Sequence, residues 1–304
     1  MINFVELGKK IYRLENPREA HRFAVFVARC CLHPKSMERV ENFFAQDELL
    51  SAIAEKFPFV YEQVTRAFFY HRSTFDERIK LVEEHFEFMT RTLSREFLLR
   101  LYGDEKILLW SMPVDETLGE LRLMLWMNEG QRKEGLASVI LMLSRGSPVY
   151  QIMFWVARDA AGDFSMWIGA MQGPNVDDAR ELIKTLTKKC HAYRTKNLIL
   201  YAAQAVARAL GLKKIYAVTN AGYYANNHIR VDRKLKTSFS DFWLECGGAP
   251  TDDERFFSLP LSETRKTVEE IPSHKRAVYR KRFALLDEID AAVADKIQAF
   301  RRGD

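Results

Sequence analysis

Residues 196–219 read KNLILYAAQAVARALGLKKIYAVT, and this stretch decides the fold. Residues 196–210 are apolar nearly all round, which is typical of a helix buried on every side. Gly211 follows as a natural C-terminal cap. Lys214–Thr219 is then a short run with β-branched residues, the pattern of a central strand. Because the alanines of the helix allow a close approach to a sheet, the unit predicts a buried helix packed on a sheet.

Upstream of this unit the chain carries strand patterns. After Gly103, short apolar and β-branched runs are separated by Gly, Pro or charged residues. The runs are Lys106–Met112, Leu121–Met127, Ala137–Leu143, Gln151–Ala157 and Phe164–Met171. Short turn-forming segments at 145–148 and 159–163 indicate hairpins. These features predict an antiparallel meander.

Helices are predicted before and after the meander. Apolar residues recur at three- and four-residue steps between Pro17 and Leu101. After the meander, Asn175 is expected to cap an amphipathic helix that extends to Cys190. Further strands are predicted at Phe242–Cys246 and Phe256–Pro260, and a charged helix begins at about Lys275.

The predicted class is therefore α+β. An N-terminal helical region, residues 1–103, precedes an α/β domain, residues 104–304, in which a mixed, mostly antiparallel sheet is covered by helices. The 304 residues, 47% hydrophobic and 29% charged, are enough to bury a full core. No stretch reaches the roughly 18 apolar residues of a membrane span, and no secretion signal is visible, so we expect a cytoplasmic protein.

Composition and motifs exclude several classes of protein. The net charge of +5 favours acidic partners without requiring them. The four cysteines have no paired zinc spacing and are interpreted as reduced and structural, so no metal is expected. The absence of P-loop, GxGxxG, HExxH and GxSxG motifs argues against kinases, dinucleotide oxidoreductases, zincins and serine hydrolases.

Four spaced motifs resemble one bacterial family. They are Ile168–Pro174, Ile215–Gly222, Phe242–Glu245 and Ile271–Arg276. Together they look like the VirK/YbjX-like proteins, and the likeness extends from the early helices to about Asp287. Members of that family are associated with virulence and resistance to antimicrobial peptides, which implies an effect on the cell envelope and assigns no catalytic residue.

The order of elements also resembles the GCN5-related N-acetyltransferase fold. In that fold two central strands splay apart around the thioester of an acyl-CoA, and here those strands would be Phe164–Met171 and Lys214–Thr219. The resemblance implies no tightly bound cofactor, with acyl-CoA or another acyl carrier as co-substrate. Fold likeness alone does not give function.

A phosphate-binding loop would precede the buried helix. Arg194 and Lys196 are the best candidates for binding its phosphates, next to the open amides at the helix entrance. Asn197, Gln172 and Gly173 are placed with them as cofactor-binding residues. The alternative is that the two cations are ordinary solvated surface charges, and the usual glycine-rich pyrophosphate loop is missing.

Catalytic candidates follow the central strand. Asn220 could steer the nucleophile, and Tyr224, favoured over Tyr223, could protonate the departing thiolate. His228 belongs to the same group, and Glu245, with Asp241 four residues earlier, could act as a base toward an amine. The alternatives are that residues 220–228 form a structural turn and that both acids are solvated.

The last predicted helix begins with a basic cluster. Its cations are Lys275, Arg276, Arg280, Lys281 and Arg282. Such a surface suits an acidic carrier protein, a tRNA or an anionic lipid headgroup, or it is simply a solvated helix face. With no groove-reading motif present, DNA is not an expected partner.

Two hypotheses about function follow. The first is an acyl- or aminoacyl-transferase that moves an acyl group from CoA, acyl carrier protein or tRNA to an amine or hydroxyl. The second is a non-enzymatic virulence or envelope accessory protein with a degenerate acyltransferase-like fold. An enzyme should have a cleft between the two central strands, whereas an accessory protein should fill it with side chains.

Overall fold

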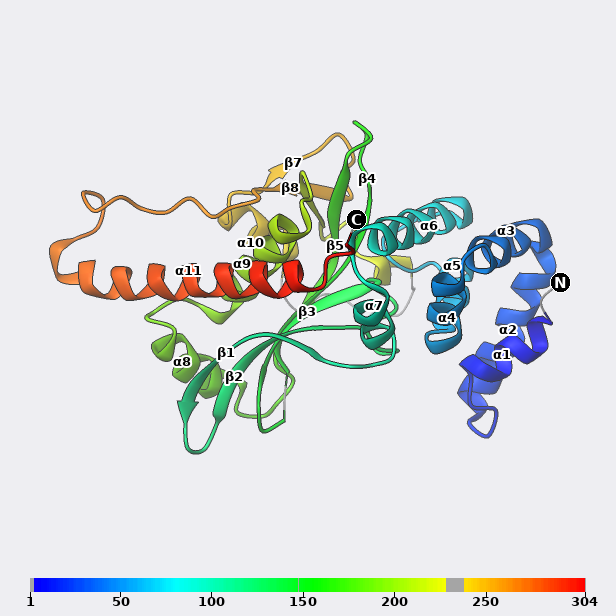
Figure 1. Ribbon diagram of the computed structural model, residues 1–304, viewed down its shortest axis with the longest axis horizontal. Helices are drawn as coiled ribbons and strands as arrows, with labels where there is room; N and C mark the ends of the chain where they lie inside the picture. Colours follow the sequence, from blue (N-terminus) through cyan, green and yellow to red (C-terminus); the bar gives the residue numbers. More distant parts are fainter. Residues whose placement is uncertain (1–2, 147, 228–237, 304) are drawn as a thin grey trace.

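The centre of the protein is one mixed eight-stranded sheet in the computed structural model, which describes residues 3–146, 148–227 and 238–303 (Figure 1). The strand order is β1-β2-β3-β4-β5-β6-β8-β7. The first five strands form an antiparallel meander, β6 runs parallel to β5, and β8 returns antiparallel to β6. The bounds are β1 (Ile107–Asp115), β2 (Gly119–Trp126), β3 (Ala137–Leu143), β4 (Pro148–Arg158), β5 (Phe164–Gln172), β6 (Ile215–Val218), β7 (Ala249–Pro250) and β8 (Phe256–Leu259). The predicted α+β class is confirmed.

Helices precede the sheet, as the apolar spacing predicts. They are α1 (Phe4–Ile11), α2 (Pro17–Leu32), α3 (Pro34–Ala45), α4 (Glu48–Lys56), α5 (Phe59–Thr65), α6 (Phe75–Thr92) and α7 (Arg95–Leu101). Thr74 and Glu77 form a capping box at the start of α6, which satisfies two amides that the helix itself leaves unpaired. Helix α6 lies against β4, so it joins the N-terminal helices to the sheet.

A buried histidine connects α6 to β4. Nδ1 of His85 in α6 accepts the backbone N–H of Val156 in β4 at 3.0 Å, and Nε2 lies 2.7 Å from the hydroxyl of Tyr102. Nδ1 must therefore be unprotonated, and Nε2 carries the ring proton. Burial lowers the pKa of His85 to about 3, so the ring is neutral near pH 7.

The buried helix of the deciding stretch is α9 (Thr195–Leu210), and it ends as predicted at Gly211, whose φ is 78°. Helix α8 (Ala179–Lys189) starts later than the sequence suggested. Its N-cap residue is Asp178, whereas Asn175 lies outside the helix and Val176, expected on the inner face, is exposed. The expectation that Asn175 caps this helix is therefore wrong.

The predicted strand Phe242–Cys246 is also wrong, because these residues belong to helix α10 (Phe239–Glu245). The side chain of Ser238 accepts the N–H of Asp241 at 3.1 Å, which stabilises the first turn. Phe239, Phe242 and Trp243 are buried at helical spacing, and Trp243 donates its indole N–H to the carbonyl of Val218 at 2.8 Å.

Helix α11 (Arg276–Ala299), preceded by the 3₁₀ turn Ser273–Lys275, closes the chain. It packs along α9 and reaches β1, while its first turns extend beyond the sheet (Figure 1). Helix α9 packs in turn against β3 and β4. Within the described residues, no helix is both long and apolar enough to cross a membrane.

Candidate functional site

The two central strands are paired where the acyltransferase resemblance requires a gap. Met166, Trp167 and Ile168 of β5 pair with Ile215, Tyr216 and Ala217 of β6. The expected splay is therefore wrong along these residues. Beyond them β5 continues to Gln172, but β6 ends at Val218, which pairs with Phe256 of β8. The pairing between β5 and β6 therefore ends at Ile168 and Ala217.

The loop between β2 and β3 crosses β5 at Gly169. A Cβ on Gly169 would lie 1.9 Å from the carbonyl oxygen of Glu134 and 2.9 Å from the ring of Trp155. Since no real side chain can occupy that space, the glycine is what lets the backbone of Glu134 rest on the strand. The loop thereby places a carboxyl group at the ends of β5 and β6.

Glu134 joins those two ends by hydrogen bonds. Its Oε2 accepts from Nε2 of Gln172 at 2.8 Å, and its Oε1 accepts from the hydroxyl of Tyr223 at 3.0 Å. The residue is only 3% exposed. Burial raises the pKa of its carboxyl group to about 7, although the two hydrogen bonds oppose that shift. Glu134 can therefore both accept and donate a proton near neutral pH.

Side-chain amides extend this network in one direction. Gln131 donates to Gln151 at 3.3 Å, Gln151 donates to Gln172 at 2.8 Å, and Gln172 donates to Glu134. Oε1 of Gln131 accepts the N–H of Asn128 at 3.2 Å, which fixes the first amide. Each amide orients the next, so the lone pairs of Glu134 face two fixed donors.

The loop that carries Glu134 is held by α5 and by the segment after it. Nε2 of Gln63 donates to the carbonyls of Arg132 (2.8 Å) and Gly135 (2.9 Å). The N–H of Phe69 donates to the carbonyl of Lys133 at 2.8 Å. Arg132 also forms a 2.5 Å ion pair with buried Glu62. These contacts on both sides of Glu134 preorganise its carboxyl group.

Tyr223 reaches Glu134 from the segment after β6. Its neighbour Gly222 accepts the N–H of His71 at 2.8 Å, and Tyr223 forms an isolated antiparallel bridge with Tyr70. Burial, followed by the charge of Glu134, raises the pKa of the Tyr223 phenol above its ordinary value. The phenol therefore stays protonated and acts as a hydrogen-bond donor at neutral pH.

The predicted catalytic residues Asn220 and Tyr224 make different contacts in the structure. Oδ1 of Asn220 accepts the N–H of Phe239 at 2.7 Å, and its Nδ2 donates to Ser238 at 2.9 Å, so Asn220 caps α10. Tyr224 is buried, with its ring 5.0 Å from that of Tyr223. His228 lies outside the described residues. The hydroxyl bound to Glu134 is that of Tyr223, whereas the sequence interpretation favoured Tyr224.

The predicted anion-binding residues form a second group at the start of α9. Arg194 makes an ion pair with Glu245 and donates from Nε to Oδ1 of Asn197 at 3.1 Å. The ammonium of Lys196 lies 3.9 Å from the centre of the Phe242 ring. Asn197 and Glu245 line a cavity of about 410 Å³. Arg194, Asn197 and Glu245 are therefore brought together.

Gly173 and Gln172 lie at the end of β5, apart from that cavity's lining. A Cβ on Gly173 would lie 3.1 Å from the ring of Tyr150, so the strand end packs closely there. Arg194 lowers the pKa of the same tyrosine, although burial raises it overall.

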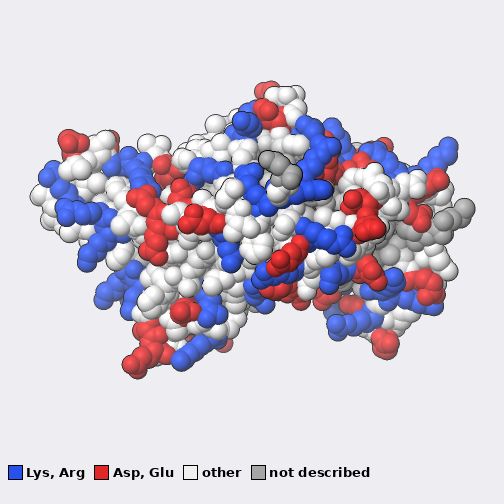
Figure 2. Space-filling model, viewed as in Figure 1, with Lys and Arg blue, Asp and Glu red and all other residues white. Residues whose placement is uncertain are grey.

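The basic cluster is divided between structural and exposed cations. Arg282 donates to the carbonyls of His191 (3.2 Å) and Ala192 (3.0 Å), which tie α11 to the turn before α9. Arg276 donates to the carbonyl of Ile271 at 3.2 Å. Lys275, Arg280 and Lys281 are exposed. Figure 2 shows Lys and Arg side chains gathered toward the end of the molecule where α11 begins.

Glu134 was not identified from the sequence. It lies in the charged stretch from Asn128 to Glu134, where acids are ordinarily solvated, so no local pattern marks it as buried. Only the close approach to Gly169, far along the chain, explains its position. Among the described residues, no group of three His, Cys, Asp or Glu side chains could hold a metal ion.

Comparison with known proteins identifies relatives without a described activity. The model of a family described as "Protein of unknown function (DUF535)" matches residues 15–295. The uncharacterized protein YbjX of Escherichia coli is 33% identical over 177 residues, which are 58% of this chain and 52% of that protein. An uncharacterized protein of Haemophilus influenzae is 29% identical over 62% of each chain.

A further relative is named membrane protein LapB, from Mannheimia haemolytica, with 25% identity over 62% of this chain and 79% of its own length. The chain spans about half the length of the Escherichia coli relative that it matches. No solved structure matches significantly. The predicted VirK/YbjX-like relationship is confirmed, while the N-acetyltransferase-like core remains a prediction.

Proposed function

The chain belongs to the DUF535 family, and for this member we propose a transferase that moves an acyl or aminoacyl group from a phosphate-bearing carrier to an amine or hydroxyl acceptor. The carrier would be CoA, acyl carrier protein or tRNA, and the reaction would take place in the cytoplasm. One observation supports this most: the buried carboxyl group of Glu134, with a pKa of about 7, held by Tyr223 and Gln172 at the ends of β5 and β6.

The proposed chemistry is direct attack. The acceptor nitrogen or oxygen forms a bond to the acyl carbon, and the bond from that carbon to the carrier breaks. The acceptor's proton passes to the Glu134 carboxylate, while the phenol of Tyr223 protonates the leaving group. The proton on Glu134 then returns to the Tyr223 oxygen, 3.0 Å away, so the pair is restored.

The carrier's phosphates would bind at the start of α9. Arg194 and Glu245 are both about half exposed, so their ion pair contributes little stability. A phosphate can therefore replace the Glu245 carboxylate as the partner of Arg194. Lys196 and Asn197 would complete the site, with Gln172 and Gly173 near the acyl group. The exposed cations Lys275, Arg280 and Lys281 would attract an acidic carrier protein or an anionic membrane surface.

The test is transfer from acyl-CoA, acylated carrier protein and aminoacyl-tRNA to amine acceptors, combined with native mass spectrometry of protein purified gently from its host. Glu134→Gln should lower turnover about 10²–10⁴-fold while carrier binding remains. The double variant Arg194→Ala/Lys196→Ala should weaken carrier binding instead. Lys9→Ala/Arg145→Ala is the matched control, since it removes two exposed cations that do not line the cavity at the start of α9. Failure of the wild type to bind or use any carrier would refute the proposal.

A second candidate, the non-enzymatic accessory protein, is favoured by one observation. Glu134, Tyr223 and Gln172 bind one another across the separated strand ends, and Asn220 is engaged in capping α10. In that case Glu134→Gln would change stability without affecting any transfer reaction. A partner would then bind the basic start of α11.

A further inference from the structure

A groove between the last turns of α8 and the first turns of α11 is lined by cations, and we call it the basic groove. Its volume is about 480 Å³. Lys184 and Lys188 line it from one face of α8, because they are four residues apart, and Lys281 lines it from α11. Among the described residues that line the groove, none is an aspartate or a glutamate. Its three ammonium groups therefore share a lining without acids.

Acids outside the lining compensate this charge weakly. Glu181 lies 3.4 Å from Lys184, but the two side chains are 69% and 76% exposed, so solvent screens the pair. Within the described part of the chain, no acid forms an ion pair with Lys188 or Lys281. The carboxyl end of α8 adds the equivalent of roughly half a negative charge. The groove therefore keeps a positive excess.

The start of α11 adds to this excess. Its N-cap residue is Lys275, Arg276 follows, and the first turn contains no acid. Because the N-terminus of a helix favours negative charge, these cations do not stabilise α11. Glu269 and Glu270 precede the helix but do not line the groove.

Arg282 places a fourth cation next to the groove. It donates to the carbonyls of His191 (3.2 Å) and Ala192 (3.0 Å), and both of these residues line the groove. Its guanidinium also lies 4.2 Å from the centre of the Tyr279 ring and 5.6 Å from that of Tyr193. Since none of these contacts is with a carboxylate, they leave the positive charge of Arg282 in place.

The turn that lines the groove is held by hydrogen bonds. His191 and Ala192 have φ values of 53° and 58°, a left-handed conformation that is unfavourable for residues other than glycine. The N–H of Ala192 donates to the carbonyl of Thr187 at 2.9 Å, and the N–H of His191 donates to that of Lys188 at 3.2 Å. Together with Arg282, these bonds fix the shape of the groove without a ligand.

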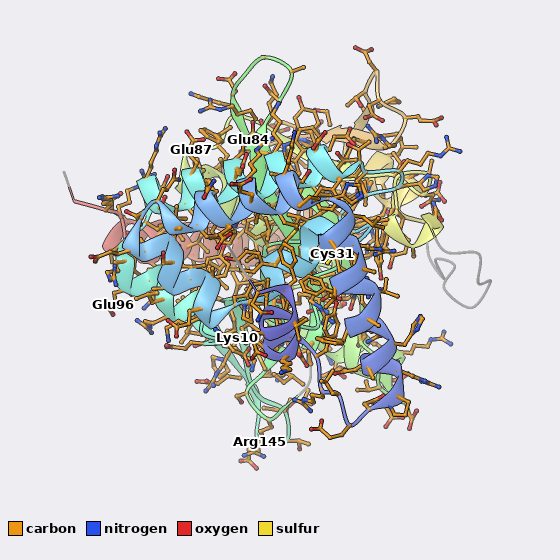
Figure 3. The ribbon with its side chains drawn as sticks, turned by 90° about the vertical axis from the view of Figure 1, so that its right-hand side faces the viewer. Lys10, Cys31, Glu84, Glu87, Glu96 and Arg145 are labelled. Atoms are coloured by element: carbon orange, nitrogen blue, oxygen red, sulfur yellow. The ribbon has the colours of Figure 1, made fainter. Side chains whose placement is uncertain are left out.

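The largest cavity described, about 1100 Å³ and bordered by α3, α4, α6 and α7, has a different lining. It contains as many acids as arginines. Arg39 pairs with Glu83, and Arg91 pairs with Glu87 at 2.8 Å. Figure 3 shows Glu87 on α6, on the face formed by the N-terminal helices. The charges of that cavity satisfy one another, whereas the lysines of the basic groove have no such partners in its lining.

We propose that the basic groove binds the phosphate group of a small organic phosphate. A phosphate monoester carries about 1.5 to 2 negative charges near pH 7 and three acceptor oxygens, which suit ammonium groups from two helices. The hydroxyl of Thr187 is a further donor in the lining, and Val278, 40% exposed, offers an apolar contact to the organic part. The volume fits a small molecule. No aromatic ring among the lining residues could stack on the bases of a nucleic acid.

The proposal goes beyond acyl transfer and does not depend on it, because Glu134, Arg194 and Lys196 do not line the groove. Two sources offer the same chemistry, a soluble phosphate ester and the head group of a lipid. Sedimentation with phosphatidylcholine vesicles, with and without phosphatidic acid, separates them. Binding that requires phosphatidic acid would assign the lipid, and binding of a soluble ester without binding to vesicles would assign the ester.

The test is calorimetry of the full chain with hexyl phosphate, and hexan-1-ol is the neutral comparison. We expect saturable binding of hexyl phosphate that weakens as the salt concentration rises, and no saturable binding of the alcohol. Absence of saturable hexyl phosphate binding, or equal binding of the two compounds, would overturn the proposal.

Variants locate the binding. Lys188→Gln/Lys281→Gln removes one exposed lysine from each helix and should weaken hexyl phosphate binding at least tenfold. Lys275→Gln/Arg280→Gln is the matched control, because it removes two exposed cations from the same end of α11 that do not line the groove. It should weaken binding no more than about threefold, since these charges act only through screened solvent.

Equal losses in the two variants would show a general attraction to a basic surface and would overturn the assignment to the groove. Loss of binding in Arg194→Ala/Lys196→Ala, with full binding in Lys188→Gln/Lys281→Gln, would place the phosphate at the start of α9 instead. That result would contradict the basic groove and leave the proposed carrier site intact.

Discussion

The hydroxyl of Tyr223 donates a 3.0 Å hydrogen bond to Oε1 of Glu134, and this contact joins residues that are 89 positions apart. It connects the β2–β3 loop to the segment after β6, where the sheet changes from parallel to antiparallel pairing. The hydroxyl belongs to one segment and the carboxyl group to the other, so the contact holds the β2–β3 loop against the segment after β6. The contact therefore contributes to the stability of the sheet, and it joins the two groups of the proposed proton transfer.

Glu134→Gln is expected to change how stability depends on pH. The folded-state pKa of Glu134, about 7, exceeds the ordinary 4.5, so the folded state binds more protons between these values. The wild-type term therefore makes the free energy of unfolding fall as pH rises through this range. Glu134→Gln removes this titrating group. The free energy of unfolding of the variant minus that of wild type should therefore be about 3 kcal/mol larger at pH 7 than at pH 4.5. Urea denaturation at several pH values measures this difference.

Glu129→Gln is the control for that experiment, because Glu129 is an exposed acid in the same loop. Its stability difference from wild type should not vary with pH over this range. The test depends on how the free energy of unfolding changes with pH. A loss of stability from rearranged hydrogen bonds that is the same at every pH therefore does not affect it. A difference between Glu134→Gln and wild type that is the same at pH 4.5 and pH 7 would contradict the raised pKa.

The sequence predicted the sheet better than the site, for physical reasons. Strands and the helix ending at Gly211 are specified by local periodicity and by a cap, so their positions were found. The segment Phe242–Cys246 was misassigned because its aromatic residues also fit a strand, whereas it belongs to α10, whose first turn is held by Asn220. Glu134 could not be found, since its burial results from a long-range approach to Gly169.

His85→Leu tests the joint between α6 and β4. The substitution leaves the N–H of Val156 and the hydroxyl of Tyr102 without their partner, which should cost about 2–4 kcal/mol. The pKa of His85, about 3, is below its ordinary 6.5, so the unfolded state binds more protons between these values. Wild-type stability therefore gains up to about 1.4 kcal/mol per pH unit from this group as pH rises from 3 to 6.5.

In His85→Leu the free energy of unfolding should no longer rise with pH through this group. Urea denaturation at pH 5 and pH 7 measures the difference from wild type. His21→Leu, an exposed histidine in α2, should keep the wild-type slope. An unchanged slope in His85→Leu would mean that the ring titrates normally in the folded protein.

Gly169→Ala tests the crossing of the β2–β3 loop over β5. The new methyl group would lie 1.9 Å from the carbonyl oxygen of Glu134, so the backbone of one segment must move. We expect a loss of about 1–3 kcal/mol or more in the free energy of unfolding. Gly130→Ala, in the same loop, meets only the side chain of Asn128 at 3.1 Å and should cost less. Equal losses in the two variants would contradict a tight crossing.

Asn220→Ala separates a structural role from a catalytic one. The substitution removes the oxygen that accepts the N–H groups of Phe239 (2.7 Å) and Ser240 (3.4 Å), so α10 should lose about 1–2 kcal/mol. Asn220→Asp keeps that acceptor and adds a negative charge, which a helix N-terminus favours, so it should retain most of the stability. Thermal and urea denaturation measure both effects.

Asn175→Ala is the matched control, because Asn175 is exposed and lies outside α8. As a surface substitution it should change stability by less than about 0.5 kcal/mol. A stable Asn220→Asp variant that nevertheless loses acyl transfer would show that the side-chain amide, which aspartate lacks, acts in the reaction. If transfer instead falls only in Asn220→Ala, in step with its stability, the residue acts by holding α10 in place.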